Sequence, residues 1–142
     1  MLVREVMSTD VLTAPARTAV RDAVGRMLDA GAGSVVVTSD GTPAGILTKV
    51  DVLQAGHEYD RPLSEIPVYA AASRPLVTVE PSATVRVAAA RMFDRDVHHL
   101  PVADGQTLVG VVTATDLLAA QGDLLREARE HREQREEWDH TD

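Results

Sequence analysis

The segment Gly45-Ile-Leu-Thr48-Lys-Val-Asp51 is echoed 65 residues later by Gly110-Val-Val-Thr113-Ala-Thr-Asp116. The same offset holds without a gap back to Thr13 and Thr78, and thirteen of the 41 aligned pairs between residues 13–53 and 78–118 are identical. An internal repeat of this kind indicates that one supersecondary unit was duplicated. We therefore expect two similar halves related by a pseudo-twofold axis, and a site that occurs twice.

Each repeat shows the same order of patterns, which predicts the order of its elements. A short apolar stretch, residues 11–14 or 76–79, precedes an amphipathic helix, two β-rich segments and a second helix that begins at Lys49 or Ala114. Apolar residues at helical spacing define the first helix: Val20, Ala23, Val24, Met27 and Leu28, echoed by Val85, Ala88, Ala89, Met92 and Phe93. The β-rich segments are residues 34–38, 44–48, 99–103 and 109–113. We expect an α/β (α+β) fold of two β-α-β-β-α units.

These patterns also predict how the chain is divided. The first repeat covers residues 1–53, a connection covers 54–62, the second repeat covers 63–120 and a charged tail covers 121–142. The lead-in of the first repeat, residues 3–6, resembles residues 63–66 at an offset of 60, which predicts five extra residues before Leu76. The tail holds eight acids and four arginines, several of them in i,i+4 opposite-charge pairs. It is expected to be a helix, either solvated or docked through Trp138.

Composition limits the classes of function. The chain has 142 residues, 44% of them apolar, so the two halves are expected to share a core. It has no cysteine and no apolar run of the ~20 residues that a membrane span needs. No signal-peptide pattern is present, so a soluble cytoplasmic protein is expected. The net charge of −8 argues against binding to nucleic acid or to an anionic membrane surface.

The paired motif resembles a known family. Two copies of an apolar-Gly-apolar-apolar-Thr-x-x-Asp segment, each after a helix and a hairpin pattern, are similar to a tandem pair of cystathionine-β-synthase (CBS) domains over residues 3–118. The resemblance implies two repeats packed through their β-sheets, with two clefts between them. It also implies that one or both clefts bind an adenosine-containing ligand such as AMP, ADP, ATP, S-adenosylmethionine or NAD(H).

The chemistry of the motif fits such a ligand. Thr48 and Asp51, like Thr113 and Asp116, are expected at the first turn of a helix, where free backbone N–H groups attract anions. The threonine hydroxyl can bond a phosphate, and the aspartate can accept from the hydroxyls of a ribose. The apolar stretches around Thr13 and Thr78 are candidate walls for an adenine, and Gly45 and Gly110 would let the strand approach a ligand. The alternative is structural: Thr-x-x-Asp is also close to a capping box.

The repeats differ where the resemblance places a phosphate. The resemblance implies that His98 and His99, which precede the Leu-Pro101-Val strand, lie near the phosphate of the ligand. The alternative interpretation is that both histidines lie on the surface at a turn. Lys49, the only lysine, follows Thr48 and is a second phosphate candidate, whereas Ala114 takes its place in repeat two. The alternative for Lys49 is a solvated side chain. We therefore expect non-equivalent clefts, occupancy of a single site, and AMP in preference to ATP.

No catalytic constellation or metal motif is present in the sequence, so neither enzymatic activity nor a metal site is predicted. The leading hypothesis is a stand-alone sensor of an adenosine nucleotide that acts by population shift on an effector protein in trans. By the same resemblance, a homodimer with a largely helical interface is expected. The rival is a ligand-free interaction or stress-associated module whose motifs only cap helices. A third hypothesis, nucleic-acid binding, is disfavoured by the acidic charge.

Overall fold

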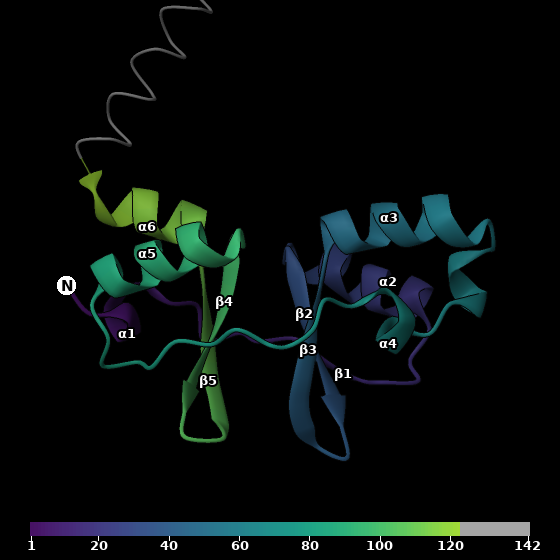
Figure 1. The fold of residues 1–142 in the computed structure, drawn as a ribbon, viewed down its shortest axis with the longest axis horizontal. Coiled ribbons are helices and arrows are strands. Elements are labelled where there is room, and N and C mark those ends of the chain that lie inside the picture. The colour runs from purple at the N-terminus through teal and green to yellow at the C-terminus, as the bar shows by residue number, and fades with distance from the viewer. Residues whose placement is uncertain (123–142) are drawn as a thin grey trace, which may run out of the picture.

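The computed structural model describes residues 1–122, and the predicted helical tail lies outside these residues apart from its first two. Two halves lie side by side, each with its helices next to its own sheet (Figure 1). The first half holds β1 (Thr13–Pro15), α2 (Val20–Ala30), β2 (Ser34–Ser39), β3 (Thr42–Thr48) and α3 (Lys49–Tyr59). The second holds α5 (Val85–Arg95), β4 (His99–Asp104), β5 (Thr107–Thr113) and α6 (Ala114–Ala120). The short helices α1 (Val3–Val6), η1 (Leu63–Glu65) and α4 (Val68–Ala71) complete the described fold. No helix within residues 1–122 is long and apolar enough to cross a membrane.

The two hairpins confirm the predicted β-rich segments and extend each by one or two residues. β2 pairs antiparallel with β3, and β4 pairs antiparallel with β5. The first turn uses Asp40 and Gly41 at positive φ (51° and 78°), the geometry of a two-residue turn that follows the right-handed twist of the strands. Both ladders shift register at the same repeat position, between Val37 and Thr38 and between Val102 and Ala103. The duplication has therefore preserved even the bulge.

The first strand of the unit differs between the halves. β1 pairs parallel with β2, whereas the predicted strand at residues 76–79 is reduced to a single parallel bridge between Val79 and Val102. In the first half the Val36 N–H donates to the Leu12 carbonyl oxygen at 2.9 Å. The residue equivalent to Val36 is Pro101, which has no N–H to donate, so the second ladder loses this bond. The prediction of a strand over residues 76–79 was therefore too long, because the partner strand lacks an N–H at Pro101.

The lead-in segments cross between the halves. α1 packs on the second half: the Val3 N–H donates to the Ala83 carbonyl oxygen at 2.8 Å, and Ser8 and Val111 exchange backbone bonds of 2.9 Å. α4 packs on the first half, where the Val68 N–H donates to the Thr18 carbonyl oxygen at 2.8 Å. Each half is thus completed by a segment that lies before the other half in the chain.

These contacts correct the alignment of the lead-in. α1 and α4 occupy equivalent places, so the offset of 65 continues through the lead-in, from Val3 to Val68 and from Ser8 to Ser73. The prediction of an offset of 60, with five extra residues before Leu76, was wrong. The resemblance of residues 3–6 to 63–66 is superficial, because η1 takes a different position from α1.

Two apolar clusters of matched composition form the core. The first contains Ala14, Val20, Ala23, Met27, Val35, Val37, Leu47, Ala55, Ile66 and Val68. The second contains Val3, Val79, Ala88, Met92, Leu100, Val102 and Val112. Every residue of the second cluster has its 65-residue partner in the first. The predicted amphipathic helices are confirmed, but Leu28 and Phe93, which the periodicity placed on the buried face, are 76% and 87% exposed.

Candidate functional site

The predicted threonines and aspartates meet at the starts of α3 and α6. At α3 the Thr48 N–H and hydroxyl donate to Asp51 Oδ2 at 2.8 and 3.0 Å, and the Asp51 N–H donates to Thr48 Oγ1 at 3.5 Å. At α6 the Thr113 N–H donates to Asp116 Oδ2 at 2.9 Å, and the Asp116 N–H donates to Thr113 Oγ1 at 3.1 Å. Both pairs form capping boxes, which stabilise the first turn of each helix.

The two aspartates differ in what surrounds them. Asp51 is 6% exposed, and its second oxygen, Oδ1, accepts from the Ser73 hydroxyl at 2.7 Å. Asp116 is half-buried, and within residues 1–122 no bond to its Oδ1 is found. The sequence identity of the two motifs therefore hides a difference in accessibility. The carboxylate of the second half is the more open to a ligand.

Gly45 and Gly110 serve a different purpose from the one predicted. A Cβ added at Gly45 would lie 2.9 Å from the Ser73 carbonyl oxygen, and one added at Gly110 would lie 2.7 Å from the Ser8 carbonyl oxygen. The crossing segments therefore lie directly on β3 and β5 at these glycines, which are required for that close approach. The expectation that they let the strand approach a ligand is replaced by this packing role.

An arginine from each first helix holds the backbone at Thr13 and Thr78. Arg26 Nη1 donates to the Thr13 carbonyl oxygen at 2.6 Å, and Arg91 Nη1 donates to that of Thr78 at 2.7 Å. Sequence reasoning gave these arginines no role, although their identity at the 65-residue offset was a usable signal. They fix the stretches proposed as adenine walls. Thr13 is exposed and Thr78 half-buried.

His99 lies at the junction of the two halves. A Cβ added at Gly33, just before β2, would lie 2.9 Å from His99 Cε1, so the ring fills the space that glycine leaves. Its Nδ1 is buried and has no hydrogen-bond partner. Burial of the ring lowers the pKa of His99 from its ordinary 6.5, the neighbouring His98 and the Lys49 ammonium lower it further, and Asp116 opposes them. These influences place Lys49 of one half and Asp116 of the other within electrostatic reach of the same imidazole.

The remaining predicted residues are less closely gathered. His98 and Lys49 have exposed side chains, whereas the Pro101 ring is fully buried in the core. His98 is tied to the second motif through its backbone, because its carbonyl oxygen accepts from the Ala114 N–H at 3.0 Å. Lys49 and Asp116 thus both influence the His99 imidazole electrostatically, whereas Thr48 and Asp51 are joined by hydrogen bonds at the start of α3.

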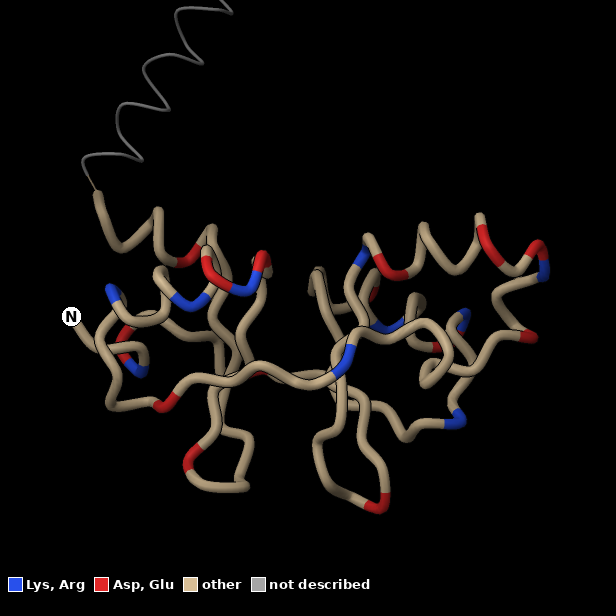
Figure 2. Tube along the Cα trace, in the orientation of Figure 1, with Lys and Arg blue, Asp and Glu red and all other residues tan. Residues whose placement is uncertain are grey.

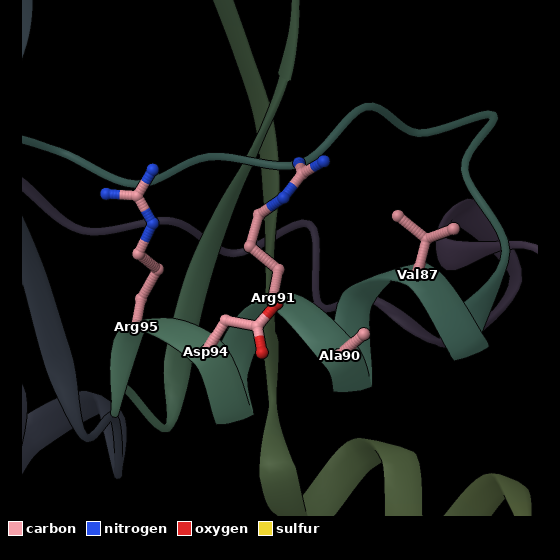
Figure 3. A pocket seen from close by; sticks show the side chains of 5 residues that line it. All are labelled: Val87, Ala90, Arg91, Asp94 and Arg95. Carbon is pink, nitrogen blue, oxygen red and sulfur yellow. The ribbon is translucent and has the colours of Figure 1, made fainter.

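A shallow hollow of about 320 Å³ lies elsewhere, on the outer side of α5. It is lined by Val87, Ala90, Arg91, Asp94 and Arg95 (Figure 3). None of the predicted site residues lines it, and one guanidinium nitrogen of Arg91 is already bonded to Thr78. Nothing here points to a particular ligand.

Within the described part of the chain, charged residues occur in both halves (Figure 2) and do not form a metal site. Positions of Lys and Arg alternate with positions of Asp and Glu along both halves of the trace (Figure 2). No group of three or more His, Asp or Glu side chains within the same residues is placed to hold a metal ion.

Comparison with known sequences adds independent findings. A family model described as the CBS domain matches the chain twice, over residues 3–58 and 63–123. The uncharacterized protein MK0525 of Methanopyrus kandleri is 33% identical over 126 residues, which are 87% of this chain and 64% of that protein. The uncharacterized protein MJ1404 of Methanocaldococcus jannaschii is 30% identical over 139 residues, which are 89% of this chain and 33% of that protein. The chain therefore spans less than two thirds of either relative.

Solved structures share the fold. The hexameric CBS-CP12 protein from bloom-forming cyanobacteria aligns with a TM-score of 0.77 and 26% identity, over 83% of this chain and 69% of that one. The CBS domain pair of protein MJ0100, in complex with 5′-methylthioadenosine and S-adenosyl-L-methionine, aligns with a TM-score of 0.77 and 20% identity, over 84% of this chain and 98% of that one. At the latter identity the likeness concerns the fold alone.

Proposed function

Because this chain belongs to the CBS-domain family and carries a pair of CBS domains, we propose that it is a regulatory module that binds an adenosine-containing nucleotide of the AMP, ADP or ATP class between its repeats. Ligand binding would favour one arrangement of the two halves, and an effector protein would recognise that arrangement. The module carries out no catalysis itself in this proposal and requires no permanent cofactor. Its place of action is the cytoplasm.

One observation carries the proposal: the half-buried Asp116 carboxylate has one oxygen, Oδ1, that accepts no hydrogen bond from residues 1–122. Thr113 occupies only Oδ2 of Asp116, and Oδ1 is available to accept from a ribose hydroxyl. His99 and Lys49 stand within electrostatic reach of each other, and a phosphate beside them would be attracted by the ammonium. A nucleoside monophosphate needs both features: an acceptor for its ribose hydroxyls and a positive charge for its phosphate. The CBS pair of MJ0100, which has the same fold, was solved with two adenosine derivatives, and this supports the choice of an adenosine-containing ligand.

The proposal includes a second copy of the chain as partner. Leu28 and Leu53 of the first half, like Phe93 and Leu118 of the second, are exposed by more than half of their surface. These positions are equivalent at the 65-residue offset, so each half presents an equivalent pair of exposed apolar side chains, one on each of two helices. A twofold interface uses one surface on both subunits, and this repeated surface suits it.

A thermal-shift panel tests the proposal. Purified protein, shown to be free of carried-over nucleotide, is heated with AMP, ADP, ATP, S-adenosylmethionine, NADH and, as a non-adenosine control, GTP. A ligand at ~100 times its Kd should add ~2.7 kcal/mol of stability, which raises Tm by several degrees. Asp116→Asn should abolish the rise. Equal shifts with GTP, or no shift with any compound, would contradict nucleotide sensing.

The capping boxes themselves favour a second candidate. Both are complete with protein groups alone, so Asp51 and Asp116 have a structural role without any ligand. In that case the chain is a ligand-free interaction module, and the apolar helix surface is its functional feature. Absence of a thermal shift together with self-association or capture of a defined partner would support this candidate.

A further inference from the structure

The two repeat-related aspartates are not equally available to a ligand. The Asp51 carboxylate accepts from three protein donors, two on Thr48 and the Ser73 hydroxyl at 2.7 Å, and it is 6% exposed. Asp116 is half-buried, and its Oδ1 has no bonded donor within residues 1–122. A ligand hydroxyl at Asp51 would therefore have to reach a buried carboxylate and compete with the Ser73 hydroxyl for Oδ1, whereas at Asp116 it would meet no competing donor.

The difference comes from the orientation of one serine. Ser73 and Ser8 occupy equivalent positions: the backbone of Ser73 pairs with Ile46 at 2.8 and 3.1 Å, and that of Ser8 pairs with Val111 at 2.9 Å in both directions. The Ser73 hydroxyl turns to Asp51. The Ser8 hydroxyl instead accepts from the Asp10 N–H at 3.4 Å, and position 75, equivalent to Asp10, is a proline without an N–H. The two orientations of the serine hydroxyl thus coincide with a difference in sequence two residues later, Asp10 in one repeat and Pro75 in the other.

We infer that Ser73 closes the first of the two repeat-related sites by occupying, at Asp51, the place that a ligand hydroxyl would take at Asp116. The inference rests on the proposed function and adds a stoichiometry to it: the chain binds one adenosine ligand, in the second site. A serine hydroxyl and a ribose hydroxyl are the same kind of donor toward a carboxylate. Because Ser73 is held in place by its backbone, it loses little freedom by making this bond, and a ligand must displace it.

The expected effect follows from the strength of that bond. Hydrogen bonds to a charged group contribute ~1.5–3 kcal/mol net, which corresponds to roughly a 10- to 100-fold weaker affinity at the closed site. Since Ser73 is exposed, its replacement by alanine removes the hydroxyl without opening a cavity in the core. The Ser73→Ala chain should therefore remain folded and expose a second carboxylate oxygen.

Isothermal titration with AMP tests the inference, with ATP and S-adenosylmethionine titrated in parallel, at concentrations near the Kd of the open site, where a site of roughly 10- to 100-fold weaker affinity stays largely empty. The wild-type chain should bind one equivalent and Ser73→Ala two. Ser8→Ala is the matched control, because it removes the equivalent hydroxyl from the open half and should keep the wild-type stoichiometry. Two equivalents on the wild-type chain would overturn the inference and leave nucleotide binding intact. Binding by neither the wild-type chain nor Ser73→Ala would overturn the proposed function and this inference with it.

A second pair of variants gives an answer even if Ser73→Ala proves unstable. Asp116→Asn in the otherwise wild-type chain should show no binding under the same conditions, because the remaining site has a roughly 10- to 100-fold weaker affinity. If half of the binding capacity stays, the first site is open and the inference is wrong. Where both changes are combined, Ser73→Ala with Asp116→Asn should restore one equivalent. Failure to restore it, in protein with unchanged circular dichroism, would also count against the role of Ser73.

Discussion

At the scale of single residues, the matched aspartates predict unequal losses of stability. Asp51→Ala removes the acceptor of three bonds in a buried position, and we expect a loss of ~2–3 kcal/mol. Asp116→Ala removes only the box partner of Thr113 at a half-buried position, for an expected loss of ~0.5–1 kcal/mol. Urea unfolding of the two variants measures both. Equal losses would show that the Ser73 contact contributes nothing to the fold.

His99 gives a prediction about pH. Because its pKa is lowered in the folded chain, mainly through burial, the unfolded chain binds the proton more readily. Stability therefore rises with pH between the folded pKa and 6.5, and it is lost as pH falls through that window. The free energy of unfolding, measured from pH 7.5 to 5, should fall less steeply for His99→Gln than for the wild type. Identical slopes for the wild type and His99→Gln would refute the effect.

Whether a contact of the site could be predicted depends on the sequence separation of the residues that form it. The Thr48–Asp51 and Thr113–Asp116 boxes lie within four residues of sequence, so the pattern alone indicated them, although not whether a ligand also binds. The bond from Ser73 to Asp51 and the packing of His99 on Gly33 join distant segments, and no local pattern encodes their geometry. The equivalence of Ser8 and Ser73 was available at the 65-residue offset but was missed with the lead-in misaligned.

At the scale of elements, the glycines under the crossing segments are predicted to be intolerant of a side chain. At Gly45 an added Cβ meets the backbone of Ser73, and at Gly110 that of Ser8, so the segment must move away. We expect Gly45→Ala and Gly110→Ala each to cost about 1–3 kcal/mol in thermal or urea unfolding.

Gly25 is the matched control. It lies inside α2 with nothing within 4 Å of an added Cβ, so Gly25→Ala should stabilise the chain by about 0.5–1 kcal/mol through helix propensity. If Gly45→Ala and Gly110→Ala behave like Gly25→Ala, the crossing segments do not dock as closely as described.

The elements also show why periodicity predicted some boundaries and not others. The hairpins, α2 and α5 have strong local patterns and were placed to within two residues, whereas α3 runs to Tyr59, six residues into the predicted connection. The strand at residues 76–79 looked as apolar as its counterpart, but its partner strand carries Pro101 where the first half has Val36, and the ladder bond is lost. Apolar character predicted the burial of Val79, whereas the pairing depended on the partner's N–H groups.

Pro101→Val tests this explanation. The new N–H would face the Val77 carbonyl oxygen, as Val36 faces Leu12, and residues 77–79 should then pair as a strand. Global stability should change by less than about 1 kcal/mol, because the gained bond is offset by the greater freedom of the unfolded chain without the proline. Hydrogen exchange at the Val79 and Ala103 amides, which already bond across this ladder, should slow by contrast. Unchanged exchange would mean that another feature limits the strand.

At the scale of the whole molecule, the exchange of α1 and α4 between the halves means that neither half is complete without the other. Val3 comes before the first half in sequence but is fully buried in the apolar cluster of the second half. Val68 comes before the second half but is fully buried in the cluster of the first. Such a molecule should unfold in one cooperative transition, and a change that loosens one lead-in should be felt in both halves. This coupling is the physical route by which a ligand on one half would be sensed by the other.

The repeated apolar surface carries the last prediction, which concerns self-association. Leu28 and Phe93 are more than three quarters exposed at equivalent positions of α2 and α5, so their replacement should not disturb the core. In a twofold dimer each contact occurs twice, so each change to aspartate should remove about 3–6 kcal/mol of association free energy, two or more orders of magnitude in Kd. Light scattering after size exclusion should therefore show a dimer for the wild type and a monomer for the double change Leu28→Asp and Phe93→Asp. Ser39→Asp, at the exposed last residue of β2 and outside both helices, should remain dimeric. A monomeric wild type at about 100 times the concentration used for the variant would exclude this surface as a dimer interface.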